Sequence, residues 1–348
     1  MKNLLLGAAA ITLATSAFAT DIKLTTISTT FNNPIGIDYH EPTDSVLMSV
    51  NYPSGSPNNF VRVKADGTQV GFSSVSGLTD ELKVATARSG SVFATGTAFT
   101  GNGIDGQIIK ISPDGSTVIN PWVDLPGSGN GLIRGSMYVD RTGVWGGDLL
   151  VVTTSGEAWR VNAAGTPTMV ASVGTHLEGL ISVPNDAAKY GPLAGKMIAG
   201  AENQGLMYVF SPDGTFTTKN VGVNIEDIDM INKNENFYGV NYGSGRLLGA
   251  ASSEFDAIAG DILLTQEFGG GPSGLFDLHW DGTSLVASPL GLAAGSQTPS
   301  QWEHVTFAPA GIVEIPHSPV PDAGSTLGLS AVAMLGLATA RRFIRPVA

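Results

Sequence analysis

The middle of the chain repeats with a period of about 49 residues, and this repeat restricts the possible folds more than any other feature. Each repeat contains a tight turn in which Gly is followed by Thr or Ser. The turns fall at Asp66, Asp114, Ala164, Asp213 and Asp281, so the spacings are 48, 50, 49 and 68 residues. Asp-Gly between apolar runs is typical of a β-hairpin, because Gly readily adopts positive φ. The pattern therefore predicts a series of hairpins.

Two further recurrences define the repeat unit. A Gly, a charged residue and a strand-like run recur at 144–152, 193–201 and 258–266, each before another short strand. Similar segments open the units at positions 34, 82, 133, 177, 225 and 302. Four strands in about 48 residues are typical of a propeller blade. We therefore predict an all-β fold over residues 20–314, a β-propeller of six four-stranded blades, with five or seven blades as alternatives.

The last two units depart from the regular pattern. The interval between Glu226 and Glu303 is long, and the segment 236–250 has the pattern of a hairpin inserted into the fifth unit. The sixth unit is short, because few residues follow its opening. We expect the N-terminal strand 22–29 to complete the sixth blade, since closing the ring removes exposed sheet edges.

The N-terminus has the three parts of a signal peptide, which we assign to residues 1–19. Lys2 is followed by an apolar stretch at 4–14 and by an Ala-x-Ala site formed by Ala17 and Ala19. Cleavage by signal peptidase after Ala19 leaves Thr20 as the new N-terminus. The alternative is a buried N-terminal helix. We predict an exported protein, and the absence of cysteine agrees with this without proving it.

The C-terminus has the pattern of a membrane anchor. A Pro-rich linker at 315–320 precedes a tail at 321–348, and this tail contains an uncharged stretch at 326–340 followed by Arg341, Arg342 and Arg345. We predict a short hydrophobic transmembrane helix of about 22 Å, less than the hydrocarbon core of about 30 Å. Snorkelling arginine side chains could extend its reach, with the basic cluster on the cytoplasmic side.

The start of this tail resembles a known sorting signal. The residues that carry the resemblance are Val320, Pro321, Asp322, Gly324, Ser325 and Thr326, with Arg341 and Arg342 at the end of the tail. They are similar to the V-P-D-S-G-S-T variant of the PEP-CTERM family, although Ala323 stands where that pattern has Ser. The resemblance implies an exosortase-like partner that cuts the tail near Pro321 at the outer envelope. A simple, unprocessed membrane anchor is the alternative.

Composition and motifs exclude several classes of function. The net charge of −12 makes nucleic acid an unfavourable partner. The chain has no cysteine, which excludes disulfides, thiolate catalysis and Cys-ligated zinc. The G-x-G-x-x-G match at 101–106 lies between two predicted strands, whereas a dinucleotide site needs a following helix. The five histidines are scattered, with no obvious pair at metal-ligand spacing.

The blade openings contain the candidate site. Alignment of the six openings places the following residues at matching positions: Ile35, Lys83, Arg134, Glu178, Glu226 and Glu303. The first strand of each propeller blade lines the central channel, so three carboxylates are expected to converge at its mouth. Clustered carboxylates repel each other unless a cation lies nearby, and calcium prefers oxygen ligands. The candidate metal ligands are Glu178, Glu226, Asp227, Glu303 and His304.

Two interpretations of this ring remain open. Lys83 and Arg134 could neutralise the glutamates as a structural ion-pair network, without any metal. The ring also resembles, loosely, the calcium-dependent lactonases of the gluconolactonase group, but no catalytic residue can be matched. We predict a non-enzymatic, envelope-anchored or matrix-associated propeller that binds a partner such as an envelope polysaccharide. A secreted calcium-dependent hydrolase or lactonase is the alternative. The five tryptophans follow the blades, which indicates packing rather than sugar binding.

Overall fold

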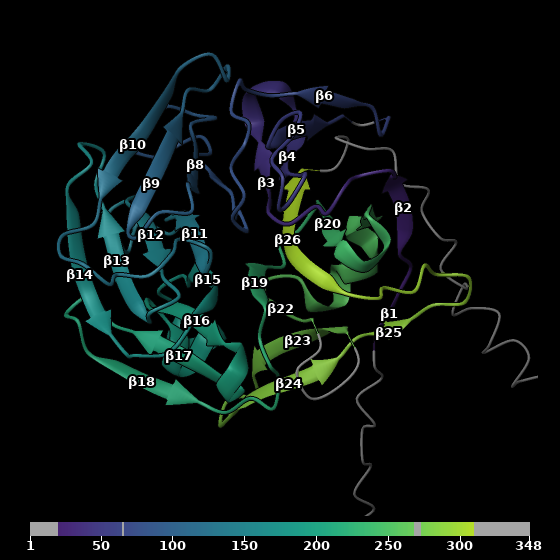
Figure 1. The fold of residues 1–348 in the computed structure, drawn as a ribbon. Coiled ribbons are helices and arrows are strands. Elements are labelled where there is room, and N and C mark those ends of the chain that lie inside the picture. Colours follow the sequence, from purple (N-terminus) through teal and green to yellow (C-terminus); the bar gives the residue numbers. More distant parts are fainter. Residues whose placement is uncertain (1–19, 65, 268–272, 310–348) are drawn as a thin grey trace, which may run out of the picture. The chain divides into compact units, whose positions relative to one another are not determined.

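Six four-stranded antiparallel sheets surround a central channel in the described part of the chain (Figure 1). The computed structural model describes residues 20–64, 66–267 and 273–309. The innermost strand of each sheet contacts that of the next, and the sixth returns to the first. The protein is therefore a six-bladed β-propeller, which confirms the predicted fold class and blade number. The expected signal peptide, linker, C-terminal helix and sorting tail lie outside the described residues.

Each of the first four blades is built from one continuous segment of chain, from the innermost strand outward. Blade 1 contains β3 (Ile37–His40), β4 (Ser45–Ser49), β5 (Phe60–Val63) and β6 (Gln69–Gly71). Blade 2 contains β7 (Ala85–Thr86), β8 (Ala98–Gly101), β9 (Gln107–Ile111) and β10 (Val118–Asp124). Blade 3 contains β11 (Ser136–Val139), β12 (Leu149–Val152), β13 (Glu157–Val161) and β14 (Pro167–Ser172). Blade 4 contains β15 (Glu178–Ser182), β16 (Met197–Ala201), β17 (Leu206–Phe210) and β18 (Phe216–Lys219).

The last two blades exchange segments. Blade 5 contains β19 (Asp227–Met230), β22 (Ile262–Gln266), β23 (Gly274–Trp280) and β24 (Leu285–Pro289). Blade 6 contains β26 (Trp302–Pro309), β20 (Glu235–Asn241), β21 (Arg246–Ala250) and β2 (Thr25–Ser28). A separate parallel pair joins β1 (Asp21–Ile22) to β25 (Gly291–Leu292). The described helices are η1 (Glu41–Thr43), α1 (Ala187–Tyr190), η2 (Gly191–Leu193), η3 (Glu202–Gln204), η4 (Tyr242–Ser244) and η5 (Ser252–Ile258).

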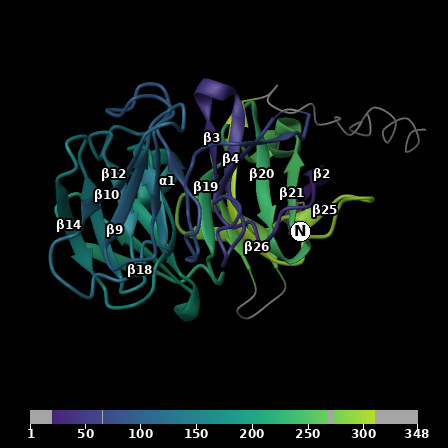
Figure 2. The ribbon, with the colours of Figure 1, turned by 45° about the horizontal axis from the view of Figure 1, so that its top comes forward.

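The assignment of the hairpin 236–250 to the fifth blade is wrong. The hairpin crosses to blade 6 and forms its two middle strands, with Phe237 opposite Phe307 and Leu248 opposite Thr26 (Figure 2). The physical reason is pairing: without the hairpin, β26 and β2 would have no neighbour between them, and their backbone groups would be unpaired. The N-terminal strand is the outer strand of the last blade, as the sequence predicted.

Apolar side chains fill the spaces between neighbouring blades. In blade 6, Trp302, Phe237 and Phe307 are fully buried and pack edge to face. Trp145 and Trp159 are also buried, which agrees with a packing role. Trp280 is half-buried against Gly191, where an added Cβ would lie 2.3 Å from Trp280 Cδ2 and where φ is +52°. This close approach requires glycine and holds the α1–η2 turn of blade 4 against blade 5.

Candidate functional site

The inner strands of blades 2, 4, 5 and 6 begin at one mouth of the channel, where acidic side chains gather. Antiparallel second strands end at this same mouth, so they contribute residues as well. We call this cluster the acidic mouth, and it consists of Glu81, Lys83, Glu178, Glu202, Glu226, Glu267 and Glu303. Its position follows from the repeat, because equivalent residues of successive blades occupy equivalent places around the axis.

Lys83 is the buried cation of the acidic mouth. Its Nζ lies 3.0 Å from Glu226 Oε1, 3.4 Å from Glu303 Oε2 and 3.9 Å from Glu81 Oε1. Burial alone would lower the pKa of Lys83, but the surrounding glutamates, Glu226 first, raise it well above its usual value. Lys83 is therefore charged at physiological pH, and it neutralises only part of the acidic charge around it.

Three glutamates of the acidic mouth approach one another closely. Carboxylate oxygens of Glu178, Glu202 and Glu226 all lie within 4.8 Å of one another. Gly179 allows this approach: it sits in a β-bulge at φ +58°, and an added Cβ would lie 2.7 Å from the Cα of Asp227. Strands β15 and β19 therefore lie very near each other at the mouth, and Glu178 reaches Glu226.

Crowding of these carboxyl groups changes their protonation. Burial, followed by the negative charge of Glu226, raises the pKa of Glu178 to about 11. Glu178 is therefore protonated near neutral pH and shares a hydrogen bond with Glu226. Burial also raises the pKa of Glu303 well above its usual value, although Lys83 opposes this. The mouth holds protons that a stronger cation could displace.

Three members of the acidic mouth were not identified from the sequence: Glu81, Glu202 and Glu267. Glu81 lies two residues before Lys83 in the opening of blade 2, whereas the other two have a different origin. Glu202 and Glu267 follow the second strands of blades 4 and 5, and both are half-buried. Burial and the charge of Glu226 raise the pKa of each to about 7. The missed signal was antiparallel pairing: Glu178 lies opposite Gly200, so residues that follow β16 must lie near the mouth.

The predicted ring is only partly assembled at the mouth. Glu226 and Glu303 meet around Lys83, and Glu178 joins them through Glu226. Arg134 does not contact these glutamates; it forms ion pairs with Glu81 and, at 3.9 Å, with Asp80. Ile35 is a buried apolar residue. The predicted metal ligands Asp227 and His304 line a deeper part of the channel.

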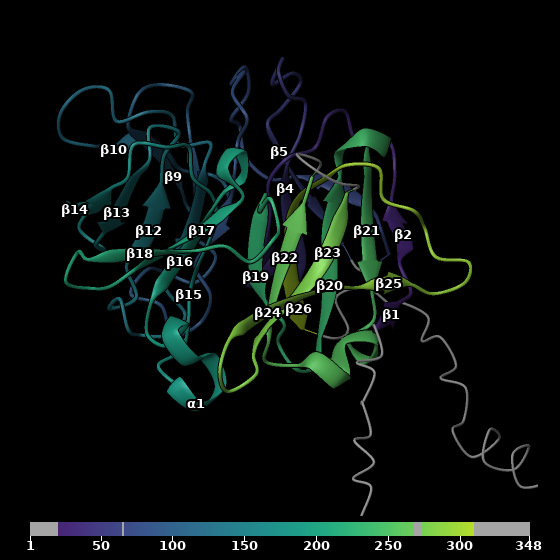
Figure 3. The same ribbon diagram turned by 90° about the horizontal axis from the view of Figure 1, so that it is seen from below.

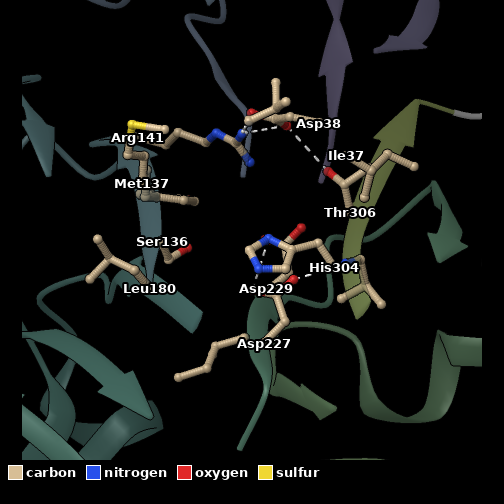
Figure 4. Close-up of a pocket in the computed structure, with 14 residues that line it drawn as sticks. Ile37, Asp38, Ser136, Met137, Arg141, Leu180, Asp227, Asp229, His304 and Thr306 are labelled. Carbon is tan, nitrogen blue, oxygen red and sulfur yellow. Dashed lines mark hydrogen bonds and ion pairs between the residues drawn. The ribbon is translucent and has the colours of Figure 1, made fainter. Parts of the chain in front are cut away.

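Aspartates in this deeper part cap the free edges of neighbouring inner strands (Figure 4). Asp227 Oδ2 accepts a hydrogen bond from Val305 N at 2.8 Å, and Asp229 Oδ2 accepts one from Phe307 N at 3.1 Å. An innermost strand has an unpaired edge toward the channel, and buried backbone N–H groups need acceptors. These buried carboxyl groups therefore have a structural role.

His304 lies beside a small cavity of about 20 Å³ in the channel. Its Nδ1 is 3.7 Å from Asp227 Oδ1, and its Nε2 has no hydrogen-bond partner among the described residues. Burial, followed by the charge of Lys83, lowers the pKa of His304 well below its usual value, so the ring is neutral. The cavity has the size of one water molecule, which could satisfy Nε2.

Comparisons with known proteins do not assign the chain to a family. No known family profile matches the chain. A search of curated proteins also finds no match. Among solved structures, a streptogramin B lyase is 11% identical, with a TM-score of 0.49, and the match covers 83% of this chain and 92% of that chain. Virginiamycin B lyase from Staphylococcus aureus is 10% identical, with a TM-score of 0.47, over 78% of this chain and 89% of that chain.

A candidate gluconolactonase is also similar, at 12% identity and a TM-score of 0.47, over 78% of this chain and 94% of that chain. These similarities are too distant to assign an activity, so the function must be argued from the residues of the site. Within the described part of the chain, no helix combines the length and hydrophobicity needed to cross a bilayer.

Proposed function

We propose that this protein is an exported propeller that binds a divalent cation in its acidic mouth. The carboxylate ligands of the mouth suit calcium best. We further propose that it acts at the cell envelope as a binding protein, after an exosortase-like enzyme processes its C-terminal tail. The observation that supports the cation is the approach of Glu178, Glu202 and Glu226, whose oxygens lie within 4.8 Å of one another. Oxygen-only ligand sets of this kind suit a hard ion such as Ca²⁺.

The charge balance of the acidic mouth also favours cation binding. Lys83 is shared between Glu226 and Glu303, and Arg134 is engaged by Glu81 and Asp80. Within the described residues, neither Glu202 nor Glu267 forms an ion pair with lysine or arginine. A divalent ion among Glu178, Glu202 and Glu226 would replace the proton that Glu178 holds and would relieve repulsion among these carboxylates.

Isothermal titration calorimetry with CaCl₂ tests this function. We expect binding that releases more than one proton near pH 7, because Glu178 and the partly protonated Glu202 must ionise to become ligands. Glu226→Gln should weaken Ca²⁺ binding by at least about tenfold, since a charged ligand is lost. Asp256→Asn is the matched control, because Asp256 is an exposed carboxylate on η5. Equal Ca²⁺ affinity in both variants would contradict the proposal.

The envelope role rests on the two ends of the chain. The signal-like segment 1–19 and the tail 321–348 support export and sorting, and the acidic mouth supports a binding role. An envelope polysaccharide with anionic groups could be bridged to the mouth through the cation. A screen of envelope polysaccharides with and without Ca²⁺ tests this step, and we expect retention only when the ion is present.

A calcium-dependent hydrolase or lactonase is the second candidate. The observation that favours it is the position of Glu202 and Glu267, half-buried carboxyls at the mouth whose pKa is raised to about 7. A group with a pKa near neutral is suited to act as a general base. Lactone or ester hydrolysis that depends on Ca²⁺ and is lost in Glu202→Gln would support an enzyme. Hydrolysis no faster than the buffer blank would leave the binding function.

A further inference from the structure

A second cluster of metal-ligating side chains lies on blade 5, outside the acidic mouth. Asp277 and His279 are two residues apart on β23, so they lie on the same face of the sheet. Ile262 pairs with Leu278, and extending this register by one residue places Asp261 opposite His279. One potential ligand atom from each of the three residues lies within 4.8 Å of the others.

Asp277 is the unusual member of this cluster. It is only 5% exposed, and its buried Oδ1 has no hydrogen-bond partner among the described residues. Its Oδ2 lies 2.9 Å from Nδ1 of His279. Burial, followed by the charge of Asp261, raises the pKa of Asp277. Buried carboxylate oxygens usually have a partner, so this oxygen is available to accept a ligand.

A lysine side chain of the neighbouring blade already places a positive charge beside this cluster. Helix α1 lies below the strands of blade 4 in Figure 3 and contacts β23 of blade 5. Lys189 of α1 forms an ion pair with Asp261, and Tyr190 Oη donates a hydrogen bond to Gly260 O at 3.0 Å. The side chain of Lys189 is 39% exposed, so its ammonium group is accessible to solvent. Its ammonium group neutralises Asp261, whereas Oδ1 of Asp277 contacts no lysine or arginine among the described residues.

We propose that Asp261, Asp277 and His279 bind a divalent transition-metal ion such as Zn²⁺. One imidazole with two carboxylates is a mixed nitrogen and oxygen donor set, which suits Zn²⁺ better than Ca²⁺. The distance of 2.9 Å between His279 Nδ1 and Asp277 Oδ2 is close to the separation of about 3.3 Å between neighbouring ligands of tetrahedral zinc. Three protein ligands leave a fourth position for water or an external ligand.

Titration of the purified full-length protein with ZnCl₂, and with CaCl₂ in parallel, tests this site. With the acidic mouth saturated by CaCl₂, we expect a Zn²⁺ site that is weakened by at least about tenfold in His279→Gln. The matched control is His176→Gln, because His176 is also half-buried beside a carboxylate, with Nε2 3.2 Å from Glu178 Oε1 at the acidic mouth. Zn²⁺ affinity that is unchanged in His279→Gln, or that falls in His176→Gln instead, would overturn the proposal.

Lys189→Met provides an independent test with the opposite sign. Removing the competing ammonium should tighten Zn²⁺ binding by about tenfold, because the positive charge beside Asp261 is lost. A purely structural ion pair predicts lower stability of Lys189→Met with no gain in Zn²⁺ affinity, and that result would count against the site. The outcome does not depend on calcium at the acidic mouth, because the two sites share no residue.

Discussion

Nζ of Lys83 lies 3.0 Å from Oε1 of Glu226, and the lysine side chain is completely buried. This pair joins blade 2 to blade 5 across the channel, two elements 143 residues apart in the sequence. Glu303 of blade 6 contacts the same ammonium group at 3.4 Å. One lysine therefore holds three blades together electrostatically and also limits how much positive charge the acidic mouth can accept from solution.

Lys83→Met should strongly destabilise the protein without calcium. The substitution leaves Glu226 and Glu303 buried without their cation, which typically costs about 3–5 kcal/mol. Calcium should restore more stability to this variant than to the wild type, because an ion can then occupy the vacated charge position. Urea denaturation with CaCl₂ or with EDTA measures this difference. Equal calcium effects on the two proteins would argue that no ion binds near Lys83.

Calcium-free protein should become less stable as the pH rises from 5 to 8. The pKa values of Glu202 and Glu267 are about 7, above the ordinary 4.5, so in this window the folded state holds more protons than the unfolded state. Stability therefore falls with rising pH, by about 1–2 kcal/mol for each group after allowance for its exposure. Thermal melts across this pH range measure the effect.

The double variant Glu202→Gln, Glu267→Gln separates the titration of these two glutamates from that of the other buried acidic groups. Neither glutamine titrates, so the loss of stability between pH 5 and 8 should become smaller. The exposed Asp256→Asn control should keep the wild-type pH profile. A double variant with the full wild-type slope would show that these two groups are not the cause.

Asp227→Ala should destabilise the protein by about 1–3 kcal/mol, because Val305 N loses its buried acceptor. Asp227→Asn should be close to wild type. Burial raises the pKa of Asp227 well above its usual value, so the native side chain is already neutral, and an asparagine oxygen can accept the same hydrogen bond. Chemical denaturation of the two variants tests this pairing, and an equally large loss in Asp227→Asn would mean that its charge is required.

Deletion of residues 20–28 should destabilise blade 6 and expose its outer edge. It removes β2, which pairs with β21, and leaves the outer edge of blade 6 without a partner. We expect a lower melting temperature and concentration-dependent association by size-exclusion chromatography. A monomer with wild-type stability would show that β2 contributes little to closure.

Protein from the native envelope should begin at or near Thr20 and should end near Asp322, if both ends are processed as we propose. Intact-mass spectrometry and terminal peptide mapping measure both positions. A mature chain that still contains Arg341 and Arg342 would exclude processing by an exosortase-like enzyme and leave an unprocessed anchor.

The repeat predicted the blades because each of the first four closes locally, with hairpins of adjacent strands. It assigned 236–250 to the wrong blade because the strand pairing of this hairpin is not local: Phe237 meets Phe307, far along the chain. Equivalent positions predicted that Glu178, Glu226 and Glu303 lie near the mouth. The positions of Glu202 and Glu267 depend instead on where the second strands of blades 4 and 5 end, and the opening motifs do not encode this.

The cluster on blade 5 was missed for a different reason. Asp277 and His279 show the two-residue spacing of a strand, but the third member, Asp261, comes from the neighbouring strand. Its position depends on the pairing register of β22 and β23. A search for histidine pairs does not detect such a set, whereas the register identifies it directly.

The composite blade 6 also determines when the molecule can be completed. Its strands come from Thr25–Ser28, Glu235–Ala250 and Trp302–Pro309. The N-terminal strand is therefore synthesised long before the C-terminal strand that completes the same blade. Until residues near 302 have been synthesised, the innermost strand of blade 6 is absent. Nothing then connects blade 5 to blade 1, and the ring stays open. Synthesis of nearly the whole propeller therefore precedes the final folding step. A chain that ends before residue 302 cannot form the closed ring.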